Sequence, residues 1–382
     1  MSRIVIAPDS FKGSISAADA SAAVASGWHD ARPGDEVVLR PMADGGEGTL
    51  AAFAAAVPGA RRVPVVVTGP DDARVEASWL LLPLTSASSS ASSSASSGAT
   101  GLVELAATSG IELLGGRQLP LDAHTAGFGE AIAAALAHGV TRLVVGIGSS
   151  ASTDGGVGML SALGARITDA DGRPVPRGAR GLARIADVDL SGLPPLPPGG
   201  VTVLTDVTNP LVGPAGAAAV FGPQKGVAAA DIAPLDAALA RFAALVGVDP
   251  DLPGSGAAGG TGYALLAWGA HLVPGAAAVA DLIGLPAALS GASVVVTGEG
   301  AFDGQSAAGK APSHVAALAA AAGVPVMLVA GRISPDAATT AFAASTSLTG
   351  LAGSPDAAMS DSARWLRAAG AVLAARLPGE SR

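Results

Sequence analysis

The 382-residue sequence has no cysteine, few aromatic residues and no long apolar run. Without cysteine it can build neither a disulfide framework nor a thiolate metal site, which fits a cytoplasmic protein. No apolar stretch reaches the roughly 20 residues of a membrane-spanning helix, so we expect no membrane partner. The opening stretch, MSRIVIAPDSF, has too short an apolar segment for a secretion signal.

Positive charge is also scarce. The formal net charge of -9 argues against nucleic acid as a partner, because proteins that bind it usually present a basic face. The chain has three lysines, Lys12, Lys225 and Lys310, each in a short polar stretch near glycine or proline. A lysine ammonium is a flexible point charge that suits a phosphate group, although solvated loops also carry ordinary lysines.

Short β-branched runs alternate with alanine-rich helical stretches, which predicts an α/β fold with a parallel sheet. The chain length favours two domains. The serine-rich tract at residues 85–101 cannot pack a core, and we interpret it as a disordered surface loop of a hairpin.

The pattern D-G-G-x-G occurs twice, each time after a strand-like run and before a helical stretch. The first copy holds Asp44, Gly45 and Gly46. The second holds Asp154, Gly155 and Gly156, and follows Ser150 in GIGSSAS. An aspartate at a strand end, followed by glycines at a helix N-terminus, favours a site for an anionic or metal-bound group. The alternative is that the glycines serve only tight turns.

Three further stretches combine carboxylates, amides and lysines. These are DSFKGS with Asp9, Ser10 and Lys12; residues 205–226 with Asp206, Asn209, Gln224 and Lys225; and residues 294–315 with Glu299, Asp303, Gln305 and Lys310. Phosphoryl transfer needs oxygen ligands for a metal, a base for the attacking hydroxyl, and cations for the moving phosphoryl group.

Residues 304–310 match the first part of a P-loop, G-x-x-x-x-G-K. Ala311 stands where that motif needs serine or threonine, and the strand-like SVVVT is expected to end at Thr297, too far from Gly304. We therefore interpret the match as coincidental and expect a helix from about Pro312. Motifs of zinc hydrolases, serine hydrolases and dinucleotide-binding dehydrogenases are missing from the sequence.

Taken together, the chain resembles the type I glycerate kinase family. The resemblance rests on IVIAPDSFKGSISA, PMADGGEGT, GIGSSASTDGGVGML, TDVTNPLVGPAGAAAVFGPQKG, GSGAAGGTGYALLAWGA and VVVTGEGAFDGQSAAGKAP. It implies a Mg²⁺-dependent kinase that phosphorylates D-glycerate with ATP, giving 2-phosphoglycerate. It also implies a Rossmann-like α/β domain from residues 1–72 plus 290–382, an inserted α/β domain at 73–289, and an active site in the cleft between them.

On this hypothesis the lysines share the charge of the phosphates and the glycerate carboxylate. The candidates for Mg²⁺ ligands and for the base are Asp44, Asp154, Asp206 and Asp303. We expect Asp154 or Asp44 to be the base, with Lys12 as the third catalytic residue. Asp206 and Asp303 are the expected metal ligands. The expected binding residues are Asp9, Ser10, Gly45, Gly46, Ser150, Gly155, Gly156, Asn209, Gln224, Lys225, Glu299, Gln305 and Lys310.

One departure bears on activity: Ala301 stands where the family usually has arginine, so an anchor for an anion is lost. A non-catalytic sugar-acid binder and a kinase for a related hydroxy acid therefore remain alternatives. The sequence also leaves open whether the protein is a monomer or a homodimer.

Overall fold

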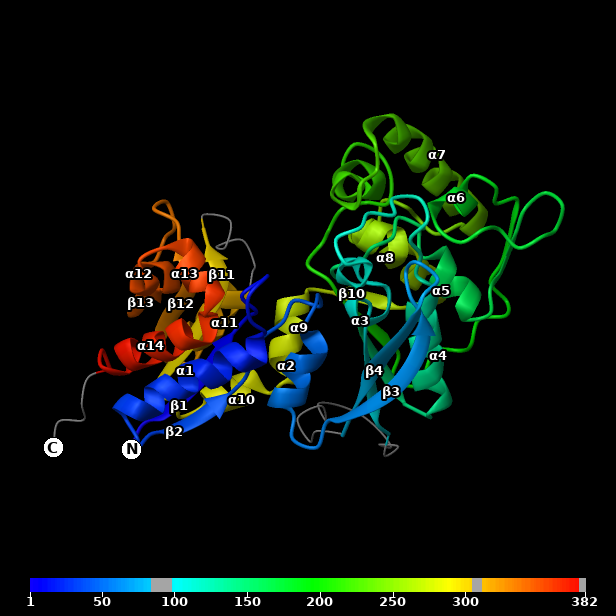
Figure 1. Cartoon of the computed structure of the whole chain (residues 1–382). Helices are drawn as coiled ribbons and strands as arrows, with labels where there is room; N and C mark the ends of the chain where they lie inside the picture. Colours follow the sequence, from blue (N-terminus) through cyan, green and yellow to red (C-terminus); the bar gives the residue numbers. More distant parts are fainter. Residues whose placement is uncertain (84–97, 304–310, 378–382) are drawn as a thin grey trace. The chain divides into compact units, whose positions relative to one another are not determined.

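We describe a computed structural model of the chain at residues 1–83, 98–303 and 311–377 (Figure 1). It has two compact units. Unit 1 consists of Met1–Asp44, Ala51–Pro58 and Ala276–Arg382, and unit 2 of Gly45–Leu50 and Gly59–Gly275. None of the helices in these ranges is long and apolar enough to cross a membrane.

These bounds differ from the expected ones at both ends of the inserted domain. Residues 59–72 belong to unit 2 because strand β3 (Arg61–Thr68) pairs along its whole length with β4 (Arg74–Leu82) in an antiparallel hairpin. Residues 276–289, which contain most of helix α9 (Gly275–Leu282) and all of α10 (Leu285–Leu289), belong to unit 1.

Unit 1 contains a five-stranded sheet in the order β13-β12-β11-β1-β2, and every neighbouring pair is parallel. The central strands are apolar on consecutive residues, as expected for strands covered on both faces. The strand bounds are β1 Arg3–Pro8, β2 Glu36–Leu39, β11 Val294–Phe302, β12 Val326–Ile333 and β13 Ala344–Ser347.

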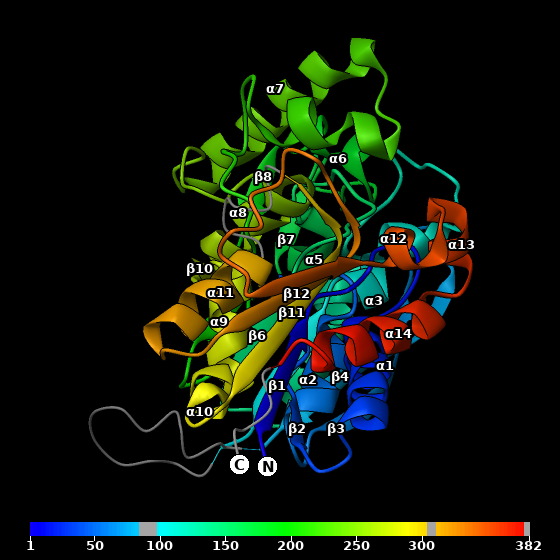
Figure 2. The same ribbon diagram turned by 90° about the vertical axis from the view of Figure 1, so that its left-hand side faces the viewer.

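Helices cover both faces of this sheet. In Figure 2, α1 and α14 lie on one side of it and α11 on the other. Trp28 of α1 and Leu366 of α14 are fully buried in the core that these two helices form with the sheet. The bounds are α1 Ala17–Ala31, α2 Thr49–Ala56 (shared with unit 2), α11 Ala311–Ala321, α12 Leu348–Ala352, α13 Pro355–Ser360 and α14 Ser362–Ala374.

Unit 2 contains a six-stranded mixed sheet in the order β10-β9-β6-β5-β4-β3 and a separate β7-β8 pair. β5, β6, β9 and β10 are parallel, and the β3-β4 hairpin adds antiparallel strands at one edge. The remaining strand bounds are β5 Thr100–Glu104, β6 Arg142–Gly146, β7 Arg166–Thr168, β8 Asp187–Asp189, β9 Val201–Leu204 and β10 His271–Val273.

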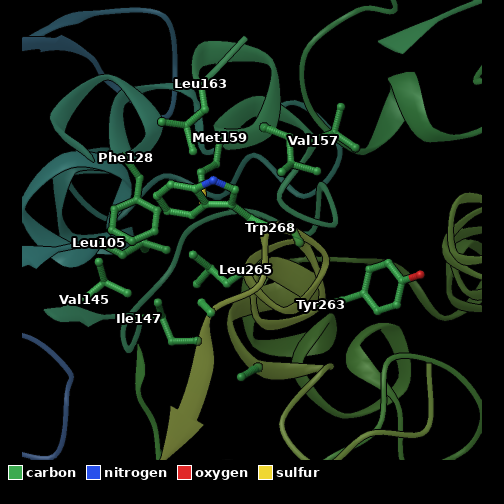
Figure 3. Close-up of a cluster of buried hydrophobic side chains, with 14 of the residues drawn as sticks. Leu105, Phe128, Val145, Ile147, Val157, Met159, Leu163, Tyr263, Leu265 and Trp268 are labelled. Atoms are coloured by element: carbon green, nitrogen blue, oxygen red, sulfur yellow. The ribbon is translucent and has the colours of Figure 1, made fainter. Parts of the chain in front are cut away.

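The core of unit 2 joins the sheet to its helices, as the buried side chains in Figure 3 show. Phe128, Met159 and Trp268 come from three different helices and pack in one cluster. The helix bounds are α3 Ala106–Ser109, α4 Ala126–Ala137, α5 Val157–Ala162, α6 Ala179–Leu182, α7 Ala229–Val246 and α8 Ala257–Trp268, with short helical turns at Ile111–Leu114, Ala217–Phe221 and Pro223–Lys225.

Two strand predictions need correction. β11 does not end at Thr297 but runs to Phe302, because Ala301 and Phe302 still pair with β12. The end of this strand therefore no longer argues against a P-loop. The serine tract was expected to extend through residue 101, but Thr100 and Gly101 pair with β4 as part of β5. The hairpin interpretation is confirmed, since β4 and β5 are antiparallel neighbours; residues 84–97 lie outside the described ranges.

Candidate functional site

The carboxyl edge of the unit 1 sheet has a point where the chain order reverses. From β1 the chain passes through α1 to β2 on one side, and from β11 it continues to β12 on the other. In open α/β sheets, ligands bind outside the carboxyl ends of the two strands that flank such a reversal. Asp9 directly follows β1, and Glu299 lies in β11, next to the Gly298 carbonyl that accepts a hydrogen bond from the Asp9 N–H at 2.8 Å.

Acidic side chains gather at this point. Burial raises the pKa of Asp9 to about 7, and the carboxylates of Asp44 and, more weakly, Glu299 act in the same direction. The Ser10 N–H, which donates to Asp9 Oδ1 at 2.6 Å, and the Lys12 ammonium oppose that rise. The structure thus brings five of the predicted residues together in unit 1, with Lys12 on an exposed turn after β1.

The first D-G-G-x-G turn lies on the carboxyl edge of the unit 2 sheet. Gly45 has φ +93°, and a Cβ there would come within 2.4 Å of the Leu204 carbonyl oxygen. Its own carbonyl accepts a hydrogen bond from Gly148 N–H at 3.0 Å. Only glycine fits this close approach, so the turn is fixed against the ends of β6 and β9.

A buried glutamate from β5 caps the N-terminus of the helix that follows this turn. Glu104 accepts hydrogen bonds from the N–H groups of Gly48 at 3.2 Å and Leu50 at 2.8 Å, at the start of α2. It is 5% exposed, and burial raises its pKa to about 7, although the two N–H groups lower it. Sequence reasoning missed this residue; the available signal was a lone acid ending the apolar run GLVEL.

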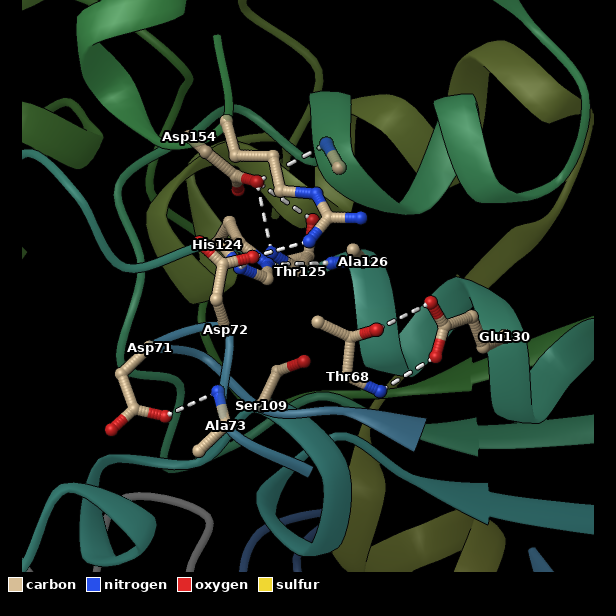
Figure 4. Close-up of polar contacts among 12 residues, drawn as sticks. Thr68, Asp71, Asp72, Ala73, Ser109, His124, Thr125, Ala126, Glu130 and Asp154 are labelled. Atoms are coloured by element: carbon tan, nitrogen blue, oxygen red, sulfur yellow. Dashed lines mark hydrogen bonds and ion pairs between the residues drawn. The ribbon is translucent and has the colours of Figure 1, made fainter. Parts of the chain in front are cut away.

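The helix after the second turn is capped in a similar way, by Asp154 of that turn (Figure 4). Asp154 has no exposed surface. Its Oδ2 accepts hydrogen bonds from the backbone N–H and the hydroxyl of Thr125, both at 2.9 Å, and from Gly158 N–H at 3.1 Å. Its Oδ1 accepts from Gly156 N–H at 3.1 Å.

These contacts bear on two predictions from the sequence. Protein carboxylates accept hydrogen bonds from N–H groups at the start of both helices that follow the D-G-G-x-G turns. Asp154 is fully buried, and its two oxygens accept four hydrogen bonds from the protein. The tight-turn alternative is supported at Gly156, where φ is +76° and a Cβ would lie 2.4 Å from Ala264 Cβ.

Thr125, also missed at the sequence level, connects this turn to α4. Its hydroxyl accepts a hydrogen bond from Met159 N–H at 2.9 Å while donating to Asp154. The neighbouring His124 is fully buried; its Nδ1 accepts from Ala126 N–H at 3.3 Å, which leaves Nε2 to donate to Asp72 at 3.2 Å. The sequence gives no signal for this network, because its members are distant in the chain.

Lys225 is not a free surface cation. It is 3% exposed, and its Nζ donates to the Ser150 hydroxyl and to the Ser152 carbonyl, both at 2.6 Å. Burial lowers its pKa to about 7, and the nearby charge of Asp154 raises it only in part. The sequence analysis named Ser150 and Lys225 as candidate binding residues, but it did not predict their pairing across 75 residues.

The other candidate residues of the 205–226 stretch also belong to unit 2. Asp206 is exposed after β9, and its Oδ1 accepts from Gly275 N–H at 2.7 Å. The Asn209 amide donates to the Ala215 carbonyl at 2.8 Å, which supports the turn-forming alternative. Gln224 is exposed. Asp303, the other expected metal ligand, belongs to unit 1.

Ala301, where the resemblance implies an arginine, has a cationic neighbour. Its register partner on β12 is the exposed Arg332, so a guanidinium is present beside that position on the adjacent strand. Gln305 and Lys310 lie outside the described residues. α11 begins at Ala311, as the sequence predicts.

The residues that the structure describes form no ready-made metal cage, and unit 1 carries a mostly apolar groove. Within residues 1–83, 98–303 and 311–377, no group of three or more His, Asp or Glu side chains could hold a metal by itself. A groove of about 720 Å³ in unit 1 runs along α11 and is lined by Phe302, Phe342 and mostly small apolar residues. It has no charged lining residue among those described, so we do not place phosphate chemistry there.

Comparison with known proteins gives one consistent result. The profile of the glycerate kinase family matches residues 4–377. Glycerate 2-kinase of Escherichia coli K12 is 42% identical over 342 residues, covering 87% of this chain and 86% of that protein, and glycerate kinase of Bacillus subtilis 168 is 41% identical with the same coverage. A crystal structure of a protein provisionally named glycerate kinase 2, from Salmonella typhimurium LT2, superposes with a TM-score of 0.81 at 39% identity, over 99% of this chain and 98% of that one.

Proposed function

Since this chain belongs to the glycerate kinase family and is a kinase that phosphorylates glycerate with ATP, we propose that its product is 2-phosphoglycerate. The name of the Escherichia coli relative, glycerate 2-kinase, supports this position of transfer. We take D-glycerate as the substrate and the cytoplasm as the compartment.

The acidic cluster with Lys12 at the reversal point of unit 1 supports phosphoryl transfer at this point. Burial raises the pKa of Asp9 to about 7, and the negative charges of Asp44 and Glu299 add to that rise. A divalent cation is favoured at such a place because it relieves the repulsion between the carboxylates. Carboxylate oxygens are the ligands that Mg²⁺ prefers, and kinase sites usually hold it with one or two carboxylates plus substrate phosphates. The residues present therefore fit Mg²⁺ without a complete protein cage.

We assign Asp9 and Asp44 as the residues that would hold Mg²⁺ with the nucleotide. When bound, the ion supplies charge neutralisation at the phosphate oxygens. Lys12, exposed beside the cluster, adds a mobile positive charge that stabilises the negative charge spread over the γ-phosphoryl oxygens during transfer. Glu299 keeps the local potential negative and so favours the cation over a second anion.

The other residues expected from the sequence remain proposed site residues. Asp206 and Asp303 stay candidate metal ligands, and Ser10, Asn209, Gln224, Gln305 and Lys310 candidate binding residues. Arg332 is proposed to replace the arginine lost at Ala301, because it stands opposite that residue on the neighbouring strand. Asp154 becomes a positioning residue that holds the second turn.

The direct test compares ADP release with and without D-glycerate, at saturating ATP and Mg²⁺. Glycerate-dependent ADP release supports phosphoryl transfer to glycerate, whichever hydroxyl accepts it. Thermal stabilisation by glycerate without ADP release would instead identify a sugar-acid binder. A panel with tartronate and longer aldonates tests the remaining alternative, since a higher kcat/KM with one of these would reassign the substrate.

A further inference from the structure

The mostly apolar groove of unit 1 has no part in the proposed function so far. Its volume is about 720 Å³, and its walls come from α11, from residues 338–343 and from the start of β12. Every lining residue that the structure describes belongs to unit 1, so the groove is formed by one unit alone. Several of its alanines, Ala317 among them, are exposed, so the groove is open to a ligand from solvent.

Two phenylalanine rings mark the end of the groove that lies towards the acidic cluster, while Val326 lines the opposite end, where β12 begins. The rings of Phe302 and Phe342 meet edge to face, with their centroids 5.5 Å apart and an angle of 85° between their planes. Phe302 ends β11 and packs in one small cluster with Ala330 of β12, and Ala330 is the register partner of Glu299. The aromatic end of the groove and the acidic cluster therefore share strand β11.

We propose that this groove binds the adenosine part of ATP, with the adenine ring against the Phe302–Phe342 pair. The triphosphate is then directed along the carboxyl edge of the unit 1 sheet to the acidic cluster. This inference rests on the proposed function, which assigns residues to Mg²⁺ and to the phosphates but leaves the base of the nucleotide without a site.

The lining suits a purine base better than a phosphate or a carboxylate. Adenine is uncharged at neutral pH and has two flat apolar faces, and its polar atoms lie on its rim. Small-molecule sites commonly measure about 300–1,000 Å³ and combine apolar and aromatic walls with a few polar groups. The groove has this character, because its described lining holds no charged residue and includes the hydroxyl-bearing Ser313 and Thr340. A hydroxyl can donate to a ring nitrogen or accept from the exocyclic amine.

The position of the groove fits the length of the nucleotide. β12 is the second strand from β1 in the sheet, so these two strands lie roughly 10 Å apart at the usual spacing between neighbouring strands. The ribose and the triphosphate chain of ATP can bridge such a span. The base then lies near the carboxyl edge, to one side of the chain reversal, where open α/β sheets bind nucleotides.

The competing account is that an apolar segment of a protein partner occupies the groove. That account predicts that a bulky side chain placed in the groove leaves nucleotide binding unchanged. Adenosine binding predicts that the same change weakens the binding of ADP but not that of tripolyphosphate, which has phosphates and no base. The two dissociation constants together therefore separate the accounts.

The variants are Ala317→Trp, which fills the groove, and Phe342→Ala, which removes one ring of the aromatic pair, with Ala22→Trp as the matched control. Ala317 and Ala22 are both exposed helical alanines of unit 1, so neither tryptophan enters the core. Ala22 belongs to α1, on the other side of the sheet from α11 (Figure 2).

Calorimetric titration with Mg²⁺ present gives Kd for ADP and for tripolyphosphate. We expect Ala317→Trp to raise Kd for ADP by about tenfold or more, and Phe342→Ala by about threefold or more. Kd for tripolyphosphate should stay within about twofold in both variants, and the control should keep both constants within about twofold. An unchanged Kd for ADP in folded Ala317→Trp, or an equal rise for the two ligands, would overturn the proposal.

A measurement on the wild-type protein covers the case in which the variants fail to fold. An azido-ADP whose azide is on the purine ring is bound with Mg²⁺ and photolysed, and the protein is then digested with trypsin. We expect label in the peptides 311–332 and 333–364, which contain the groove residues of α11 and of 338–343, and we expect excess ADP to suppress it. Label that ADP suppresses only in other peptides, or no suppressible label, would overturn the proposal.

Both experiments omit glycerate, so the two possible failures are distinguishable. A protein that binds adenosine in the groove without phosphorylating glycerate would contradict the proposed function and leave this inference standing. Glycerate phosphorylation by a protein whose ADP binding ignores the groove would contradict this inference alone.

Discussion

Asp154 Oδ2 accepts two hydrogen bonds from one residue, Thr125, through its backbone N–H and its hydroxyl, both at 2.9 Å. This double contact ties the start of α5 to the start of α4 inside the core of unit 2. We propose that an aspartate held in this way positions the turn.

Asp154→Asn should therefore act on stability more than on chemistry. The amide nitrogen cannot accept the hydrogen bonds that a carboxylate oxygen accepts, and at least one buried N–H would lose its partner. We expect a loss of about 2 kcal/mol or more in the free energy of unfolding, measured by urea denaturation. Turnover per folded molecule should stay within about tenfold of the wild type. The exposed Asp171→Asn is the control and should leave the unfolding free energy nearly unchanged.

Lys12→Ala should lower turnover with glycerate by at least about tenfold, because it removes a cation that stabilises the transferring phosphoryl group. The matched variant is Lys12→Arg, which keeps the charge and should recover part of the loss. Steady-state kinetics with both substrates saturating gives the comparison. Unchanged turnover in the alanine variant would remove Lys12 from the catalytic set.

Asp44→Asn should raise the Mg²⁺ concentration needed for half-maximal activity by on the order of tenfold, the scale of losing one group of a metal site. The same change removes the negative charge that acts on Asp9, so the pKa of Asp9 should fall from about 7. A Mg²⁺ titration of turnover at fixed ATP tests this. An unchanged Mg²⁺ requirement would argue against Asp44 as part of the cation site.

Glu104→Gln tests the pH dependence of stability. The folded-state pKa of Glu104 is raised from 4.5 to about 7, so its contribution is fully present below pH 4.5 and is lost as the pH rises to about 7. The loss amounts to at most about 3 kcal/mol. Urea denaturation across this range should show a smaller decline in the glutamine variant than in the wild type. Parallel curves for the two proteins would contradict the assignment.

Sequence patterns predicted much of the fold because the signals were local. Short β-branched runs between alanine-rich stretches predicted the α/β fold, and Pro312 predicted the start of α11, which begins at Ala311. The end of β11 was wrong because G-E-G-A-F reads as a polar loop, although in the structure pairing with β12 continues through it. The end of β11 is therefore set by pairing with β12, a parallel neighbour from a later part of the chain.

The site was only partly predictable, for a physical reason. Asp44 and Asp154 occupy the same position of the same motif, yet Asp44 is half-buried beside Asp9 and Asp154 is fully buried in unit 2. Residue type and spacing give the chemistry that a side chain can perform, whereas burial and partners decide whether it performs it. Glu104, Thr125 and the Ser150–Lys225 pair depend on contacts between distant segments, which no local pattern contains.

Phosphorus NMR of the reaction of D-glycerate with ATP and Mg²⁺ tests the central claim most directly, since it identifies the nucleotide product and the position of the transferred phosphoryl group together. The account predicts that ADP and 2-phosphoglycerate appear in equal amounts and that neither forms without the protein. A spectrum with 3-phosphoglycerate in place of 2-phosphoglycerate, or with ATP unchanged, would contradict it.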